Sequence, residues 1–188
     1  MPQSQTTIAA FNGRTPQIHS SAFIAPGCRI IGDVEIGPDA SIWYNCVIRA
    51  DVNRIVIGAR SNIQDGTVIH CESPKPRRPE GFPTIIGDDV LIGHMAMIHG
   101  SILEDRAFVG LGAIVMDGCR IASDAMLAAG AMLTQGKVIE TRQLWMGRPA
   151  AYARDLTVAA LEDMRAGVAG YVLNGKLHAE ALSGQRGG

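Results

Sequence analysis

Three histidines lie within thirty residues of one another, and their side chains could bind a metal ion. They are His70, His94 and His99. A zinc site with three protein ligands and one open position is typical of catalysis, because water occupies the fourth position. The metal lowers the pKa of that water to about 7 and so generates a hydroxide nucleophile near neutral pH. This chemistry requires a fold that brings the three imidazoles together.

A repeat of six residues runs through most of the chain and decides where the histidines lie. Aliphatic residues occupy every sixth position in four successive series, and a small residue follows most of them by four positions. The aliphatic positions are Ile18, Ile24, Ile30, Ile36, Ile42 and Ile48, then Ile57, Ile63 and Ile69, then Ile86, Ile92 and Ile98, and finally Leu103, Val109, Val115, Ile121, Leu127, Leu133 and Ile139. Neither a helical nor an alternating strand pattern fits this spacing. The repeat predicts short strands joined by tight corners, with three hexads to a triangular coil and about six stacked coils.

Two segments stand outside the repeat. The second and third series are separated by eleven residues more than one hexad, so the proline-rich stretch at about 72–84 is predicted to form an extruded loop. The pattern ends after Ile139, and Thr157 can cap a C-terminal helix. The apolar face of that helix comprises Leu161, Met164, Val168, Tyr171 and Val172. We therefore expect a β-helix domain at 1–150, followed by a helix and tail at 151–188.

The register of the repeat places two of the three histidines in one column. His70 and His99 each follow an inward aliphatic residue directly, and outside the extruded loop they are three hexads, or one coil, apart. We predict that these imidazoles stack on one face of adjacent coils, about 5 Å apart at their backbones. His94 falls on the preceding face of the prism, where we do not expect it to reach the same ion within one subunit.

A threefold assembly of prisms would complete the site. In a cyclic assembly with heterologous contacts, one surface of each subunit meets a different surface of the next. His94 of one subunit would then meet His70 and His99 of its neighbour. We predict a homotrimer with three interfacial metal sites; the alternative is that the histidines are corner residues with ordinary hydrogen bonds.

The same register places further polar side chains near the predicted site. Arg49 lies in the column of the stacked histidines, whereas Gln64 and Asp65 lie on the face that carries His94. Across an interface, Arg49 can meet Asp65, and Gln64 can approach a metal-bound water. Arg49, Asp51 and Asp65 could act in catalysis or could only lock the trimer through salt bridges, and both roles stay open.

Composition and charge limit the classes of partner. The chain has 17 Lys and Arg against 18 Asp and Glu, without a long run of either sign, so nothing indicates binding to nucleic acid or to an anionic membrane surface. No secretory leader and no stretch of about 18 apolar residues is present. We expect a cytoplasmic protein whose partners are small molecules and copies of itself.

The remaining cysteines and histidines suggest mostly structural roles. Three of the four cysteines occupy small inward positions and are predicted to be core residues. Cys71 adjoins His70 at the mouth of the extruded loop and could be a reactive thiol, although an inert thiol is the favoured interpretation. His19 and His178 have no partner in the register, so we expect both on the surface.

Several short motifs together resemble the motif series of the γ-class carbonic anhydrases and their bacterial relatives. The motifs are Ile48-Arg49-Ala50-Asp51, Asn62-Ile63-Gln64-Asp65, Val68-Ile69-His70, Gly93-His94 and Ile98-His99-Gly100. The resemblance covers roughly residues 10–175. It implies an all-β solenoid, a left-handed parallel β-helix of hexapeptide repeats with a C-terminal α-helix. The hand rests on the resemblance alone, since most crossover connections are right-handed.

The resemblance also implies an activity, the reversible hydration of CO2 to bicarbonate by a metal-bound hydroxide. It implies metal ligation by His70, His94 and His99, water positioning by Gln64 with Asn62 orienting it, and an interface network of Arg49, Asp51 and Asp65. Tyr171, on the terminal helix, could reach a neighbouring site, as tyrosines do in some relatives, or could simply pack. The ligand set suits Zn2+, with Fe2+ or Co2+ as alternatives.

The sequence departs from the best-characterised members of that family at the predicted proton shuttle. Those members carry glutamates in an acidic loop near the metal, whereas here Val52 follows the Arg-Ala-Asp motif and the 72–84 loop is basic. Glu72 is the nearest candidate carboxylate. The alternatives to a carbonic anhydrase are therefore a metal-dependent thioesterase or hydrolase, a hexapeptide acyltransferase, and a catalytically silent metal-binding scaffold.

Overall fold

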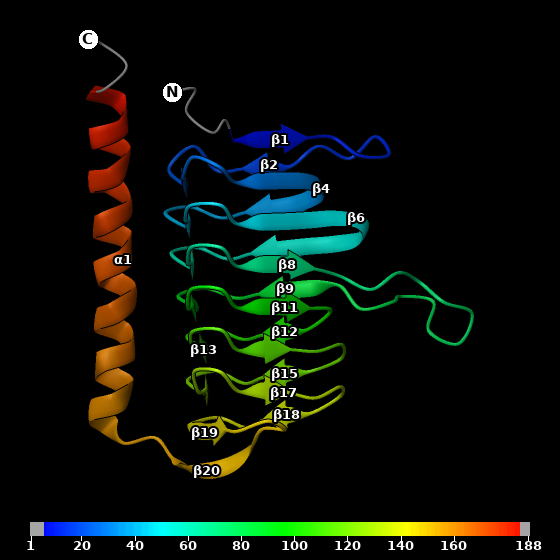
Figure 1. The fold of residues 1–188 in the computed structure, drawn as a ribbon, viewed down its shortest axis with the longest axis vertical. Helices are drawn as coiled ribbons and strands as arrows, with labels where there is room; N and C mark the ends of the chain where they lie inside the picture. Colours follow the sequence, from blue (N-terminus) through cyan, green and yellow to red (C-terminus); the bar gives the residue numbers. More distant parts are fainter. Residues whose placement is uncertain (1–5, 185–188) are drawn as a thin grey trace.

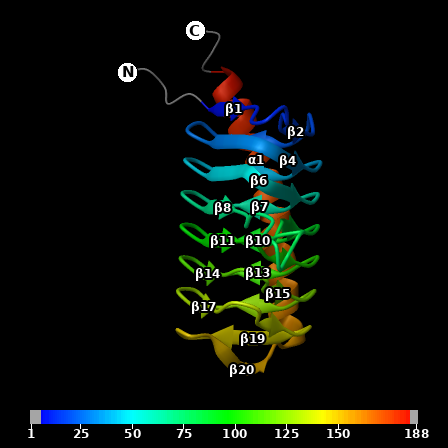
Figure 2. The same cartoon turned by 90° about the vertical axis from the view of Figure 1, so that its right-hand side faces the viewer.

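The six-residue repeat winds the chain into a left-handed parallel β-helix with three flat faces (Figures 1 and 2). A computed structural model describes residues 6–184. Successive coils stack along one axis, and a single long helix runs beside them. The predicted fold class is confirmed.

The strands form two sheets, and the larger sheet bends around a corner to cover two faces. It contains β1 (Thr7–Ala9), β2 (Gln17–Ile18), β4 (Arg29–Ile36), β6 (Val47–Ile57), β8 (Val68–His70), β9 (Thr84–Ile86), β11 (Met97–His99), β12 (Ile102–Leu103), β14 (Ile114–Val115), β15 (Arg120–Ile121), β17 (Met132–Leu133) and β18 (Val138–Ile139). We call the face formed by β8, β11, β14 and β17 the histidine face. Strands β9, β12, β15 and β18 form the second face.

The smaller sheet forms the third face, which we call the helix face because α1 (Val158–Gly184) covers part of it. It contains β3 (Phe23–Ile24), β5 (Ser41–Ile42), β7 (Asn62–Ile63), β10 (Leu91–Ile92), β13 (Phe108–Val109), β16 (Met126–Leu127), β19 (Gln143–Met146) and β20 (Ala151–Asp155). All neighbouring pairs in this sheet are parallel except β19 with β20.

Stacked aliphatic side chains fill the interior of the prism. Ile48, Ile69 and Ile98 lie in register on adjacent coils, and each is fully buried. Small residues such as Ala113 and Ala131 occupy the second inward position, where a narrow triangular cross-section leaves little room. Each large aliphatic side chain contributes about 1.5–3 kcal/mol through burial, so the repeat itself supplies the core.

One corner of the prism carries an alternating column of acidic and basic residues. This corner leads into the helix face, and six successive coils each place one non-glycine residue there in the left-handed backbone region, with φ between 55° and 62°. The residues are Asp39, Arg60, Asp89, Arg106, Asp124 and Arg142. Arg60 donates to both carboxylate oxygens of Asp89 at 2.6 and 2.7 Å, and Arg106 to those of Asp124 at 2.9 and 3.2 Å. The attraction between opposite charges on adjacent coils thus offsets the backbone strain of these residues.

The repeat continues one hexad further than the sequence analysis predicted. Strand β19 pairs in parallel with β16 and sets Trp145 opposite Leu127, so an aromatic side chain takes the position six residues after Ile139. In the described part of the chain seven parallel strands therefore cross the helix face, compared with about six predicted coils. Strand β20 then turns back antiparallel to β19 at the end of the prism (Figure 1).

The predicted C-terminal helix is confirmed and packs against its own prism. The Ala160 amide donates to Thr157 Oγ1 at 3.2 Å, so Thr157 caps the helix as expected. The helix runs back along the coils toward the N-terminal end (Figure 1). Its buried residues are Leu161, Met164, Val168 and Gly175. Within residues 6–184, no helix is both long and apolar enough to cross a bilayer.

The proline-rich segment at 72–84 protrudes from the prism between β8 and β9, as predicted (Figure 1). An antiparallel bridge between Glu72 and Phe82 closes the base of the loop. The side chain of Asn53 donates to the carbonyl oxygens of Glu72 and Glu80 at 2.9 and 2.8 Å. The base of the loop is thus tied to β6.

Truncation of one stacked aliphatic residue should show how much the core contributes. We expect Ile121→Ala to lower the free energy of unfolding by about 2–5 kcal/mol, because Ile121 is fully buried and leaves a cavity. The matched change Ile102→Ala, on a side chain that is 44% exposed, should cost less than about 1 kcal/mol. Urea denaturation of both variants measures the difference, and equal losses would contradict the assigned register.

Candidate metal centre

His70 and His99 face each other across adjacent coils of the histidine face. Strands β8 and β11 pair with His99 directly opposite His70. The Nδ1 atom of His70 lies 3.0 Å from Nε2 of His99, and the ring centroids are 5.0 Å apart. The stacking predicted from the register is confirmed.

A carboxylate holds the other ring nitrogen of each imidazole. Nε2 of His70 lies 2.9 Å from Asp51 Oδ1, and Nδ1 of His99 lies 2.6 Å from Asp117 Oδ1. If each nitrogen donates its proton to the carboxylate, the unprotonated nitrogens of the two rings face each other. Two facing lone pairs repel unless a proton or a cation lies between them, so the pair is arranged to hold a positive charge.

The distance between the facing nitrogens fits two ligands of one metal ion. Zn–N bonds of 2.0–2.1 Å in a tetrahedral site set neighbouring nitrogens about 3.3 Å apart, and the observed separation is 3.0 Å. Carboxylates hydrogen-bonded to the far nitrogen are the usual outer shell of a histidine-bound metal, because they fix the tautomer and the ring orientation. The donor set therefore fits a divalent cation.

Asp51 connects the histidine pair to Arg49. Arg49 donates to the second carboxylate oxygen of Asp51. Burial alone would raise the pKa of the Asp51 carboxyl, but hydrogen bonds from His70 and then Arg49 hold that pKa below its ordinary value. Asp51 is therefore ionised at neutral pH. Arg49 is paired within its own chain, and its contact with Asp65 of a neighbouring subunit stays a prediction.

His94 lies at a different corner, where the chain leaves β10 and turns toward the histidine face. Its Nδ1 atom is 2.8 Å from Asp65 Oδ2, and its side chain is 43% exposed. This contact leaves Nε2 for another partner. Among residues 6–184, no group of three or more His, Cys, Asp or Glu side chains could hold a metal ion. One chain therefore supplies two imidazoles at one position and a third at another.

Asn62 and Gln64 are buried near the corner that carries His94. The Gln64 side-chain amide donates to Asn62 Oδ1 at 3.1 Å, which is the contact that an orienting role for Asn62 requires. Asn62 Nδ2 is buried without a hydrogen-bond partner in the described structure, a cost of about 1–3 kcal/mol. Gln64 Oε1 accepts no hydrogen bond from Asn62, so it can accept one from another group.

Tyr171 packs against its own chain. Its ring meets Trp43 edge-on, with the centroids 5.4 Å apart. Burial, and then the negative charge of Asp65, raise the pKa of the Tyr171 hydroxyl. The hydroxyl is therefore protonated at neutral pH.

Comparisons with known proteins define the family. Models of "Bacterial transferase hexapeptide (six repeats)" match residues 15–50, and models of "Hexapeptide repeat of succinyl-transferase" match residues 83–107 and 100–135. A protein of Geobacillus kaustophilus named "Carbonic anhydrase" is 41% identical over 179 residues, which cover 95% of this chain and 94% of that protein. "Gamma carbonic anhydrase 2, mitochondrial" of Arabidopsis thaliana is 40% identical over 170 residues. The chain belongs to the γ-class carbonic anhydrase family.

The extent of these matches differs between relatives of the γ-class family. The Arabidopsis match covers 90% of this chain but only 61% of that protein, so this γ-class chain spans about three fifths of its length. A solved structure of a hexapeptide transferase family protein from Anaplasma phagocytophilum is 40% identical, with a TM-score of 0.84, and covers 90% of this chain and 96% of that one. The γ-class prism and the transferase prism thus share one architecture.

The structure of this γ-class chain also shows two residues that the sequence analysis missed or misplaced. Asp117 is absent from the predicted site, although the register could have placed it there. Val115 pairs with Ile98, and Asp117 follows Val115 by two positions. The expectation that His178 is an unpartnered surface residue is wrong. Its Nδ1 atom lies 2.9 Å from the Tyr44 hydroxyl, and its ring contacts Trp43 with centroids 4.9 Å apart. The hexapeptide register does not describe how α1 lies on the prism, so it could not predict this contact.

Cys71, which follows His70 in the chain, is buried. Its exposed fraction is 1%, and burial raises the pKa of its thiol to about 11. The thiolate is the reactive form, so a buried thiol with a raised pKa is inert at neutral pH. The structure therefore favours the inert interpretation.

Thiol titration tests this conclusion. All four cysteines are buried, so we expect the native protein to react with Ellman's reagent at pH 7.5 at least about 100-fold more slowly than an exposed thiol does. Four thiols should appear after unfolding in guanidinium. Leu173→Cys, on an α1 side chain that is 59% exposed, provides a positive control with one fast thiol. A fast thiol in the native protein that disappears in Cys71→Ala would contradict the inert interpretation.

Proposed function

We propose that this protein is a γ-type carbonic anhydrase that interconverts CO2 and bicarbonate at metal sites between the subunits of a homotrimer. The observation that carries the proposal is the facing pair of His70 and His99, each held by a carboxylate and separated by 3.0 Å. The relatives named carbonic anhydrase support it, because this chain matches one of them over nearly its full length. A cytoplasmic location is part of the same proposal.

The surface around the histidines supports a subunit interface. Val68 and Met97 pair across β8 and β11 and point outward from the histidine face, with exposed fractions of 36% and 48%. Met95 and Leu111, at the corner beside His94, are 71% and 53% exposed. Large apolar side chains exposed near one another are typical of an interaction surface. Burial of these side chains in a trimer would bring the His94 corner to the histidine face of the next subunit.

The proposed roles follow from the hydrogen bonds of each group. His70 and His99 would hold the metal together with His94 of a neighbouring subunit, and Asp51 and Asp117 fix the ligand tautomers. When bound, the divalent metal supplies a coordinated water whose pKa is about 7. Zn2+ fits three imidazoles, and Fe2+ or Co2+ would serve the same chemistry.

Gln64 would orient the reacting water. The amide of Gln64 is fixed by Asn62, so Gln64 Oε1 is presented as a hydrogen-bond acceptor in one orientation. An acceptor of this kind directs one proton of a water and so aims its lone pair at the carbon of CO2. Because CO2 is apolar, the exposed apolar side chains on the histidine face, Val68 and Met97, would admit it readily.

Glu72, the candidate carboxylate at the base of the loop, is a weak proton carrier. The ion pair with Lys75, at 3.1 Å, and a hydrogen bond from Ser73 lower the pKa of the Glu72 carboxyl. A carboxylate with a lowered pKa accepts a proton less readily near neutral pH. We therefore propose that soluble buffer removes the proton directly, with no relay through Glu72.

Mixed trimers provide the sharpest test of an intersubunit site. Neither His94→Ala nor His99→Ala alone should support CO2 hydration. When the two chains are co-expressed and assemble at random, about one quarter of the interfaces combine the intact His94 of one chain with the intact His99 of the other. We expect about one quarter of the wild-type turnover in a stopped-flow assay, with metal content recovered in the same proportion.

The control pair and the contrary outcomes follow from the same geometry. His70→Ala mixed with His99→Ala should recover nothing, because both changes damage the same half of each interface. No recovery in either mixture would contradict the shared site. Metal bound at wild-type levels without CO2 hydration would contradict the activity and favour thioester hydrolysis or a scaffold role.

The carboxylate behind His99 gives a second prediction. Asp117→Asn keeps the side-chain shape but loses the charge that orients the imidazole. We expect metal affinity to fall about 10–100-fold, as measured by competition with a chelator. Asp105→Asn, in another coil, should leave affinity unchanged; equal losses in the two variants would mean that the effect is on folding.

A further inference from the structure

A cavity lies between α1 and the prism, at the corner that leads into the helix face. Its volume is about 430 Å³, within the range of small-molecule sites. This corner precedes β10, whereas His94 follows it. The cavity therefore shares no residue with the histidine site, and the inference drawn from it does not depend on the proposed function.

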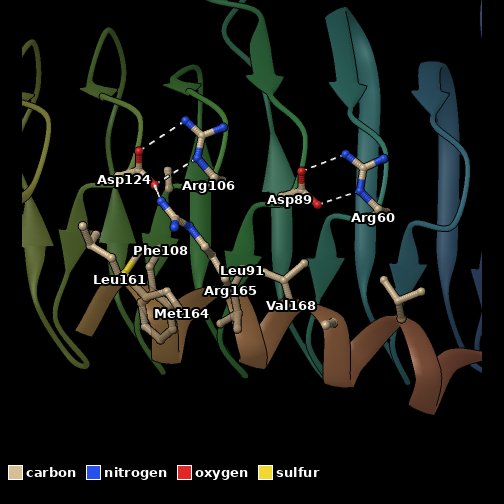
Figure 3. A pocket seen from close by; sticks show the side chains of 13 residues that line it. Arg60, Asp89, Leu91, Arg106, Phe108, Asp124, Leu161, Met164, Arg165 and Val168 are labelled. Atoms are coloured by element: carbon tan, nitrogen blue, oxygen red, sulfur yellow. Dashed lines mark hydrogen bonds and ion pairs between the residues drawn. The ribbon is translucent and has the colours of Figure 1, made fainter. Parts of the chain in front are cut away.

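The floor of the cavity is apolar and comes from both the helix and the prism. Leu91 and Phe108 project from β10 and β13, and Leu161, Met164 and Val168 project from α1 (Figure 3). Gly167 keeps the helix close, since a Cβ atom there would lie 3.3 Å from Leu91. The walls are thus side chains held by regular elements, which favours a preformed site.

Three arginines and two of their aspartate partners line the rim of the cavity. Arg60 donates hydrogen bonds to both carboxylate oxygens of Asp89, and Arg106 does the same to Asp124 (Figure 3). Arg165, from α1, comes only within 3.7 Å of Asp124, whose carboxylate is already engaged by Arg106. Arg60 also lies 3.6 Å from Asp88, so the three guanidinium groups meet three carboxylates. Arg165 is the cation with the weakest contact.

We propose that this cavity binds a monoanionic amphiphile of the medium-chain fatty carboxylate class. The hydrocarbon chain would lie against the apolar floor, and the carboxylate would pair with Arg165 at the mouth. At about 30 Å³ for each non-hydrogen group, the volume holds roughly a dozen such groups, the size of decanoate. A single weakly paired cation does not match a polyphosphate such as a nucleotide, and a neutral hydrocarbon would leave Arg165 without a new partner.

Calorimetric titration of the full-length protein with decanoate tests the proposal. We expect saturable binding with one site per chain, about 10-fold weaker binding of decanol, which lacks the charge, and no binding of butyrate, which lacks the chain. Arg165→Gln should weaken decanoate binding about 10-fold. Lys176→Gln is the matched control, because Lys176 also lies on α1 and also stands 3.7 Å from a corner aspartate, Asp39, but outside this cavity.

A local probe separates binding in the cavity from binding elsewhere. In protein labelled at methionine methyl groups, decanoate should shift the NMR signal of Met164 and leave that of Met95 unchanged. Thermal unfolding of each variant shows whether it is folded. The proposal is overturned if decanoate does not bind saturably, if Arg165→Gln and Lys176→Gln weaken binding equally, or if Met95 responds and Met164 does not.

Discussion

Every feature of this molecule depends on the parallel stacking of one coil on the next in a fixed six-residue register. The backbone hydrogen bonds between coils set the distance from one coil to the next. The inward aliphatic residues decide which positions of each hexad point into the core. A slip of one residue would exchange inward and outward side chains, so the register is strongly held. Any two residues at equivalent positions of adjacent coils therefore become neighbours, as His70 and His99 do on the histidine face and as Arg60 and Asp89 do at the charged corner.

The same stacking explains why one chain offers two parts of a site that do not meet. A straight prism holds residues of one column at short distances but keeps its corners apart, so it can present a pair of imidazoles and a separate third imidazole. The first pair is rigid because strands carry the rings and Asp51 and Asp117 hold their far nitrogens. In the proposed trimer, the fold of one subunit would set the distance between His70 and His99. Association with a neighbouring subunit would supply the third ligand.

The extent to which the structure follows from the sequence depends on whether the repeat governs a given contact. The register predicted the faces, the buried columns, the stacking of two histidines and the extruded loop. It missed the last hexad because Trp145 occupies an aliphatic position, and it could have identified Asp117. The contacts of α1 follow no hexapeptide period. The partnership of His178 with Tyr44 and the cavity beneath Arg165 therefore required the structure.

The alternating column of Asp39, Arg60, Asp89, Arg106, Asp124 and Arg142 has a consequence for how such a protein can lengthen. Solenoids grow by duplication of whole coils, which leaves the stacking of the core intact. Here, duplication of a single coil would set two arginines or two aspartates beside each other, and like charges at about 5 Å repel. Duplication of two coils would preserve the alternation of sign. The unit of tolerated insertion in this part of the gene is thus expected to be a pair of coils.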